Sequence, residues 1–258
     1  MSAGVPQASL HPEWFESAVA RALLEAQSAR LRATLDGVFG EHLLQIGRWG
    51  TREGVKPLAR TQAATTVYGR GEGGDVAAEF WNLPFATSSV DALVMPHTLD
   101  FSERPHDVLR EAHRVLRSEG KLVMLAFKPF GFWGLRNFLT PGGYPTGARR
   151  LQGERNLKDW LALLNMRVDD YERFFFRLPL RGLGAPISAR WESIGRRWWP
   201  EFAACQLITA RKRFAAMTPL RPSWRTRAQV VGGSVSETGL RPVARLRKGP
   251  GDQDPTPS

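Results

Sequence analysis

Residues 82–128 have the sequence NLPFATSSVDALVMPHTLDFSERPHDVLREAHRVLRSEGKLVMLAFK, and this stretch decides the fold class. Two apolar runs, Val90–Met95 and Lys121–Phe127, each have the length of a fully buried β-strand. Between them, Glu103–Arg117 carries apolar residues at helical spacing, and Gly120 is expected to end that helix. A strand, a crossover helix and a second strand form the repeating unit of an open, mostly parallel α/β sheet.

The rest of the chain extends this alternation of strands and helices in both directions. Further strands are expected over Glu41–Ile46, Ala64–Tyr68, Asp75–Phe80, Asp169–Leu178 and Ala203–Lys212. Further helices are expected over Pro12–Asp36, over a short segment ending at Leu139, over Asn156–Leu164 with Asn156 as its N-cap, and over the amphipathic piece Ala189–Trp199. These patterns predict five alternating strand and helix units, followed by a helix and two more strands.

Composition is typical of a soluble globular protein, with 42% hydrophobic and 24% charged residues. No run of 18 apolar residues exists, so no membrane span is expected, and the N-terminal residues do not form a secretory signal. The single cysteine, Cys205, can form neither an intramolecular disulfide nor a cysteine-based metal cluster. We therefore expect a cytoplasmic protein.

The net charge of +11 is concentrated near the C-terminus. Residues 211–258 hold ten Lys/Arg and three Asp/Glu, whereas the other 210 residues hold 26 and 22. The basicity is therefore mostly a property of the tail, and a basic tail favours nucleic-acid binding only weakly. The chain is expected to divide into an N-terminal helical segment (1–40), an α/β domain (41–213) and a basic disordered tail (214–258), in which Pro, Gly, Ser and Arg dominate.

The first strand runs into Gly47-Arg48-Trp49-Gly50. Glycines at this point let the backbone bend sharply and approach a ligand, which in α/β folds binds off the carboxyl ends of the strands. The spacing Gly-x-x-Gly is common by chance, so this signal alone does not identify a ligand.

Three motifs together resemble the class I S-adenosylmethionine-dependent methyltransferases: Leu83-Pro84-Phe85, Val90-Asp91-Ala92-Leu93-Val94, and the run from Glu111 to Leu122. The subgroup that the chain is most similar to is the type 11 family, in a bacterial branch with Phe-x-Pro and Trp-Gly-Leu-Arg after the fifth strand. The resemblance covers Glu41 to Arg213. It implies a Rossmann-like, seven-stranded, mostly parallel sheet with helices on both faces and an antiparallel last strand, and it makes 41–213 the methyltransferase domain.

The resemblance also implies where S-adenosylmethionine would bind. The glycine-rich first loop of the family corresponds to Gly47–Gly50, and the acid that bonds the adenine amino group corresponds to Glu79. The implied cofactor-binding residues are Gln45, Gly47, Trp49, Gly50, Glu79, Phe80 (through its backbone N–H), Met95 and His97.

This chain departs from the family pattern at three positions. Gln45 stands where the first motif commonly opens with an acid, and Trp49 replaces the second of three glycines. Tyr68 stands near the acid that grips the ribose, with Glu72 the nearest substitute. Each lost charge-assisted hydrogen bond is worth roughly 1.5–3 kcal/mol, so weaker cofactor binding is expected.

His97 follows a strand end, where its imidazole could line the pocket or accept a proton from the methyl acceptor. Methyl transfer is an in-line displacement in which positioning does most of the work, so a base is optional. Trp133 and Arg136, in the aromatic loop after the fifth strand, are candidates for substrate binding. The alternatives are packing in the core for the tryptophan and a solvent-facing position for the arginine. No histidine pair has metal-ligand spacing, so no metal is expected.

Three hypotheses follow. The first is a cytoplasmic methyltransferase that transfers a methyl group from S-adenosylmethionine to a small, partly apolar molecule. The second is a non-catalytic binding or scaffold protein with the same fold, which the changes at Gln45, Trp49 and Tyr68 favour. The third, an RNA-directed protein that uses the basic tail, lacks a recognisable RNA-binding module. The methyl acceptor and the oligomeric state are not predicted.

Overall fold

The computed structural model describes residues 17–51, 53–69, 74–141, 144–145, 147–148, 151–177, 197–198 and 200–213. All of them fall within the unit Met1–Ala216. They contain a seven-stranded sheet with the order β3-β2-β1-β4-β5-β7-β6. The strands are β1 (His42–Ile46), β2 (Ala63–Tyr68), β3 (Val76–Ala77), β4 (Val90–Pro96), β5 (Leu116–Phe127), β6 (Met166–Phe174) and β7 (Cys205–Lys212).

Neighbouring strands from β3 to β5 run parallel, and β7 runs antiparallel to both of its neighbours, β5 and β6. The predicted Rossmann-like sheet with an antiparallel last strand is therefore confirmed. The order reverses between β1 and β4, which is the topological switch point of an open α/β sheet.

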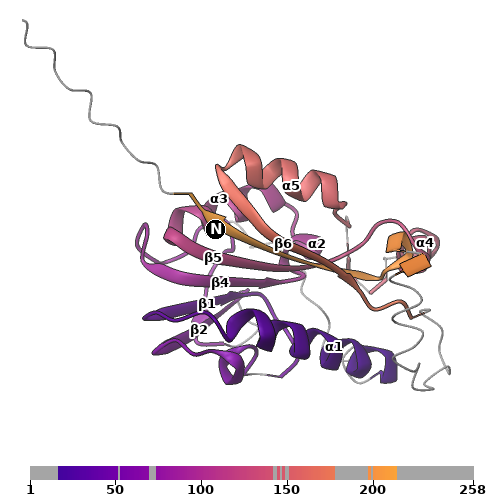
Figure 1. Ribbon diagram of the computed structural model, residues 1–258, viewed down its shortest axis with the longest axis horizontal. Helices are drawn as coiled ribbons and strands as arrows, with labels where there is room; N and C mark the ends of the chain where they lie inside the picture. Colours follow the sequence, from indigo (N-terminus) through magenta and orange to yellow (C-terminus); the bar gives the residue numbers. More distant parts are fainter. Residues whose placement is uncertain are drawn as a thin grey trace, which may run out of the picture. The chain divides into compact units, whose positions relative to one another are not determined.

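Helices cover both faces of the sheet (Figure 1). Helix α1 (Ala18–Leu35) lies on one side, and α3 (Pro105–Val115) and α5 (Glu154–Leu163) lie on the other. Strand β5 serves both layers, because alternate side chains point to opposite faces. Leu122, Met124 and Ala126 join the core beneath α3 and α5, whereas Val123, Leu125 and Phe127 join the core beneath α1.

The prediction that Gly120 ends the crossover helix is wrong. Helix α3 ends at Val115, and the next residue, Leu116, is already extended and fully buried. Gly120 lies within β5, where a Cβ atom would come within 2.8 Å of the Arg117 carbonyl oxygen. Close packing in an irregular strand start, rather than a helix terminus, requires glycine here.

The expected alternation of five strand and helix units is also wrong at its beginning. Between β1 and β2 the described residues contain only one short 3₁₀ turn, η2 (Lys56–Leu58). The predicted strand Asp75–Phe80 shrinks to Val76–Ala77, because Glu79 and Asn82 form an isolated bridge that turns the chain. Among the described residues, α3 is the one regular crossover helix between the parallel strands β1 to β5 that lies wholly within a single strand-to-strand connection and spans several turns.

Other boundaries shift by a few residues. The first helix begins at Ala18 with Ser17 as its N-cap. Helix α4 (Phe132–Leu139) ends where predicted, and α5 begins two residues before Asn156 with Gly153 at its N-cap. Helix α2 (Thr98–Phe101) and the 3₁₀ turn η3 (Pro200–Phe202) complete the described elements. The tail 214–258 and residues 189–196 of the predicted amphipathic piece lie outside the described residues.

Candidate active site at the β1–β4 switch point

The carboxyl ends of β1 and β4 meet at the switch point, and two candidate cofactor segments follow them. β1 leads into the loop that begins at Gly47, and β4 leads through His97 into α2. Parallel pairing of β1 with β4 puts both exits at the same edge of the sheet. The structure therefore brings Gln45, Gly47 and His97 into one neighbourhood.

The turn after β1 is fastened to the start of α2. Gly47 has φ +93°, a left-handed conformation that favours glycine, and its N–H donates to the Val67 carbonyl. Thr98 Oγ1 donates to the Ile46 carbonyl at 2.5 Å. A Cβ atom at position 47 would lie 3.0 Å from Thr98 Oγ1. Gly50, with φ +59°, supplies a second left-handed bend three residues later.

The side chain of Gln45 holds the loop after β1 through two hydrogen bonds. Its side chain is fully buried, its Nε2 donates to the Gly47 carbonyl at 2.7 Å, and its Oε1 accepts from the Val55 N–H at 2.8 Å. A Cβ atom on Gly54 would collide with the Gln45 amide. Both ends of the amide thus hold the loop in place, which is a role that a carboxylate, an acceptor only, could not fill alone.

A buried hydrogen-bond relay closes the space between the two strand ends. Trp49 Nε1–H donates to Gln27 Oε1 at 2.7 Å, and Gln27 Nε2 lies 2.7 Å from His97 Nε2. His97 Nδ1 lies 3.2 Å from Asp100 Oδ2. Side chains from α1, the first loop, the end of β4 and α2 are therefore linked in series.

The direction of this relay is set at one end by Trp49, because an indole N–H can only donate. Gln27 must accept with Oε1 and donate with Nε2, so His97 Nε2 is an acceptor. A neutral imidazole with its proton on Nδ1 then donates to Asp100. Both ring nitrogens of His97 are engaged within the fold, and neither is directed at a methyl acceptor in this arrangement.

The His97 backbone is as constrained as its ring. Its φ of +57° is unusual for a residue other than glycine, and its N–H donates to the Leu125 carbonyl at 2.8 Å. The imidazole stacks on the Phe127 ring with 3.9 Å between centroids. Strained backbone held by its surroundings is common at functional sites, which supports the choice of His97 as a site residue.

Asp100 is a fully buried acid at the end of the relay. Burial raises the pKa of its carboxyl group, and hydrogen bonds from His97 and from the backbone N–H groups of Phe127 and Gln152 oppose that rise. Oδ2 accepts the Phe127 N–H at 2.8 Å, whereas Oδ1 is buried with no hydrogen-bond partner among the described residues. An unsatisfied carboxylate oxygen of this kind would gain from a donor on a bound ligand.

The outer strands position the candidates for the adenosine end. Tyr68 ends β2 as a buried side chain with a pKa raised by burial, and the Arg48 guanidinium lies 5.6 Å from its ring centre. Glu79 is half-buried just after β3, and its carbonyl accepts the Asn82 N–H. Phe80 packs as a buried side chain in the core beneath α3.

Asp75, an acidic residue close to β2, is bonded to the sheet. Asp75 accepts hydrogen bonds from the Thr66 N–H and hydroxyl at 2.7 and 2.8 Å. Lys56 Nζ lies 2.7 Å from its other oxygen, and this hydrogen bond is the main reason that the Asp75 pKa is lowered. The carboxylate therefore ties the strand edge to η2.

In the aromatic segment after β5, the side chain of Trp133 is buried in the core, whereas that of Arg136 lies nearer the surface. Trp133 is 1% exposed, donates from Nε1 to the Arg177 carbonyl at 2.7 Å, and lies 5.7 Å from Phe127 between ring centres. Arg136 covers the Tyr144 ring at 3.9 Å. Met95, also buried, packs within the core rather than at the surface. Trp133 thus takes the core-packing alternative in this arrangement, one aromatic neighbour away from His97.

Sequence reasoning missed three residues of this site: Gln27, Thr98 and Asp100. The signal for Gln27 was visible, since it interrupts an apolar series at four-residue spacing, Leu23, Leu31 and Leu35. A polar residue within the buried stripe of a helix requires a buried partner. Asp100 and Thr98 carried no comparable signal, because α2 is a single turn.

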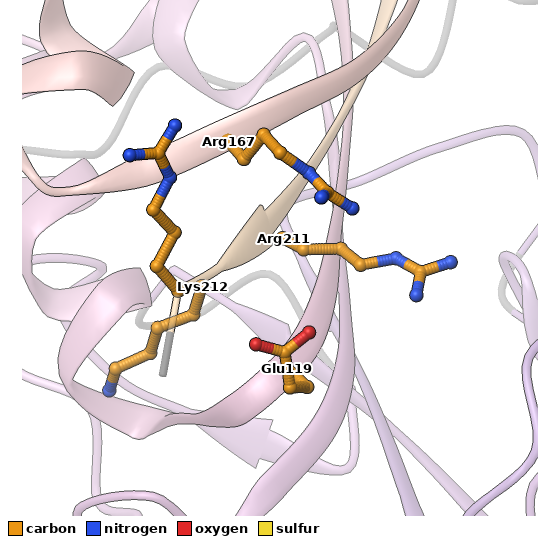
Figure 2. A pocket seen from close by; sticks show the side chains of 5 residues that line it. Glu119, Arg167, Arg211 and Lys212 are labelled. Atoms are coloured by element: carbon orange, nitrogen blue, oxygen red, sulfur yellow. The ribbon is translucent and has the colours of Figure 1, made fainter. Parts of the chain in front are cut away.

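A cavity of about 300 Å³ lies away from the switch point, at the opposite, amino-terminal ends of the parallel strands, and is shown in Figure 2. Glu119, Arg167, Arg211, Lys212 and Arg213 line it. Several of the basic side chains that line this cavity are bonded to other groups of the protein. Arg167 and Arg211 contact the two oxygens of Asp169 at 3.0 and 2.7 Å, and Lys212, whose pKa is lowered by burial, donates to two carbonyls of the α3–β5 junction.

Two absences hold for the part of the chain that is described. No group of three or more His, Cys, Asp or Glu side chains there could hold a metal ion. None of the described helices combines the length and the apolar character needed to cross a membrane.

Comparison with known proteins places the chain. The sequence model of a methyltransferase domain, type 11, matches residues 55–124. The uncharacterised protein YafS of Escherichia coli is 33% identical over 226 residues, which cover 86% of this chain and 90% of YafS. The chain belongs to the type 11 family of class I methyltransferases. The family match runs from η2 through β2, β3, β4, α2 and α3 to most of β5, and it begins after β1 and the Gly47–Gly50 turn.

Solved structures share the fold of this type 11 member. A S-adenosylmethionine-dependent methyltransferase from Thermotoga maritima superposes with a TM-score of 0.58 at 21% identity, covering 78% of this chain and 94% of that one. The geranyl diphosphate C-methyltransferase of Streptomyces coelicolor, solved with S-adenosylhomocysteine, gives 0.51 at 16% identity, covering 81% and 84%. Binding of S-adenosylmethionine is thus a property of the family.

Proposed function

We propose that this protein is a S-adenosylmethionine-dependent methyltransferase whose cofactor binds at the switch point between β1 and β4. The observation that carries the proposal is the turn after β1 in a type 11 family member. Gly47 and Gly50 both adopt left-handed conformations there, beside the strained His97 that leaves β4. In open α/β sheets, ligands bind off the carboxyl ends of strands at this point.

The side chains and backbone groups near the switch point suit the separate parts of the cofactor. The Gly47–Gly50 backbone would follow its methionine end, with the Trp49 indole as a wall. Glu79 would accept the adenine amino group, and the Phe80 N–H would donate to the ring.

S-Adenosylmethionine, when bound, supplies a methyl group on a sulfonium centre that is attacked in line by the acceptor. The contribution of the protein is to position the acceptor and to exclude water. We assign His97 to the wall of the pocket, since its two nitrogens are held by Gln27 and Asp100. A role for His97 as a base would require Gln27 to release Nε2.

The acceptor is proposed to be a small, partly apolar molecule. Phe127 and Trp133 form a stacked aromatic pair behind His97, with 5.7 Å between ring centres. Both rings are buried, so they would favour an apolar acceptor only through the low polarity that they give the wall behind His97. Trp133 would contribute through this wall, and Arg136, half-buried on the Tyr144 ring, would meet the polar end of the acceptor.

A second candidate function is a binding or scaffold protein without catalysis. The observation that favours it is the use of Gln45 and Trp49 in internal hydrogen bonds. Trp49 cannot turn toward a cofactor until its bond to Gln27 opens, and Gln45 is held by the Gly47 carbonyl and the Val55 N–H. If the relay never opens, the fold persists without the activity.

The remaining assignments stay proposals as well. We take residues 41–213 as the methyltransferase domain, with 1–40 as a helical segment before it and 214–258 as a basic tail after it. The single cysteine, Cys205, is buried in β7, which is consistent with a reducing compartment such as the cytoplasm.

The adenine assignment can be tested through Glu79. In Glu79→Ala, thermal stabilisation by S-adenosylhomocysteine should fall, with at least a tenfold weaker dissociation constant, because a carboxylate acceptor is lost. Asp159→Ala, at an exposed carboxylate on α5, is the matched control and should keep the wild-type shift. Equal shifts in both variants would show that Glu79 does not contact the cofactor.

A further inference from the structure

Helix α4 and the chain that leads into it expose several large apolar side chains. Their exposed fractions are 72% for Phe130, 44% for Phe132, 56% for Leu135, 87% for Phe138 and 68% for Leu139. On a helix the last four fall within an arc of roughly 120°, while Trp133 and Gly134 are buried on the other side. Single exposed apolar residues are ordinary, but five within ten residues form a contiguous patch.

The patch continues onto η3, which is distant from α4 in the sequence but lies beside it in the fold (Figure 1). The rings of Phe132 and Phe202 are 5.2 Å apart, and Phe202 is 43% exposed. Trp198, four residues earlier, is 71% exposed. We call Phe130, Phe132, Leu135, Phe138, Leu139 and Phe202 the α4 patch.

The two stretches of chain that supply the α4 patch are strongly basic. Residues 129–153 and 175–202, which include the whole α4 patch, together contain eight arginines and two acids, Glu192 and Glu201. Among the described arginines, Arg197 is exposed, and Arg136 and Arg177 are half-buried on the rings of Tyr144 and Phe175. Aromatic and aliphatic side chains combined with arginines are typical of surfaces that lie in the headgroup region of an anionic bilayer.

The charge argues against a second copy of this chain as the occupant. A twofold interface brings the same surface of two molecules together, so the described Arg136, Arg177 and Arg197 would lie near their own copies. Like charges across an interface cost binding energy, whereas anionic lipid headgroups attract them. An eight-residue helix, roughly 12 Å long, is also too short to span a bilayer but long enough to lie in its interface.

We propose that the α4 patch docks this protein on an anionic lipid surface. The location fits such a role, because α4 starts soon after the carboxyl end of β5. On its inner side Trp133 contacts Phe127, which stacks on His97 with 3.9 Å between centroids. Docking through α4 therefore sets the switch-point edge of the sheet near the membrane surface. The inference does not depend on cofactor binding or on catalysis.

The test is co-sedimentation of the full-length protein with vesicles, without cofactor. Vesicles of phosphatidylcholine containing about one-third phosphatidylglycerol should pellet the protein, and pure phosphatidylcholine vesicles should retain little. Phe138→Ser should weaken partitioning about tenfold, since one large apolar side chain no longer enters the interface. Phe39→Ser is the matched control, because Phe39 is 72% exposed in the turn before β1, at the other edge of the sheet.

Both variants keep the basic residues after Arg213, so any attraction from that part of the chain is the same in both. Equal partitioning of Phe138→Ser and wild type would overturn the proposal, because charge alone would then account for binding. No binding to anionic vesicles would overturn it as well. A concentration-dependent dimer that Phe138→Ser dissolves would assign the α4 patch to a second copy instead.

Discussion

Gln27 Nε2 lies 2.7 Å from His97 Nε2, so a residue of the first helix is bonded to the residue that leaves β4, 70 positions later. The same amide accepts the Trp49 indole N–H. Helix α1 is therefore part of the candidate active site rather than only a cover for the sheet. The state of the switch point depends on whether α1 keeps these two hydrogen bonds.

Replacing Gln27 should be costly for the fold. In Gln27→Leu, which conserves much of the volume, Trp49 Nε1 and His97 Nε2 are both left buried without their partner. Each unsatisfied group costs about 1–3 kcal/mol, so we expect a loss of about 2–4 kcal/mol in the free energy of unfolding, measured by urea denaturation.

Ser28→Ala is the control for that experiment. Ser28 is the next residue on α1, and its hydroxyl donates to the Leu24 carbonyl within the same helix. We expect a change of less than about 0.5 kcal/mol, since serine and alanine both fit the helix and no buried partner is orphaned. Equal losses in the two variants would contradict the buried relay.

Gly47 should not tolerate a side chain. Gly47→Ala would require a left-handed alanine and would place Cβ 3.0 Å from Thr98 Oγ1, so we expect a loss of about 1–3 kcal/mol. Affinity for S-adenosylhomocysteine should fall as well, because the loop would move. Gly37→Ala is the matched control, since no atom lies within 4 Å of its Cβ position, and it should leave both measurements unchanged.

The ion pairs between α5 and β6 predict a specific pH dependence of stability. Burial tends to raise the Glu154 pKa, but hydrogen bonds from Lys158 and Arg173 at 2.6 Å prevail and lower it to about 2. A carboxyl group whose pKa is depressed on folding stabilises the fold above its unfolded pKa. That stability is lost as the pH falls through the folded value.

Glu154→Gln should therefore be less stable than wild type by about 1 kcal/mol at pH 7, as expected for partly exposed ion pairs. The difference should shrink between about pH 4.5 and about pH 2, where wild-type Glu154 takes up its proton. Asp107→Asn, which breaks an exposed pair with Arg110, should change stability little at any pH. A constant difference down to pH 2 would contradict the assignment.

The residues that could be predicted from the sequence are those with a local signal. Val90–Met95 and Lys121–Phe127 are apolar except for Asp91 and Lys121, because both faces of their strands are covered, and that pattern sufficed for the fold. The prediction for Gly120 was wrong because, in the sequence, a glycine required by close packing in a strand looks the same as one that ends a helix.

The candidate site was less predictable than the fold because its order comes from contacts distant in sequence. Gln45 and Trp49 differ from the family pattern, and the sequence alone predicts only a loss of cofactor contacts. Their new partners, Val55 and Gln27, lie 10 and 22 residues away and are identified only by the folded structure. A substitution that weakens one interaction can thus be retained for another.

Isothermal titration calorimetry of the full-length protein with S-adenosylmethionine and S-adenosylhomocysteine tests the proposed function most directly. We predict saturable binding of both ligands at one site per chain, weakened by Gly47→Ala but not by Gly37→Ala. Absence of binding heat for either ligand at about 1 mM, where even weak sites of about −4 kcal/mol are half filled, would contradict the assignment of a methyltransferase.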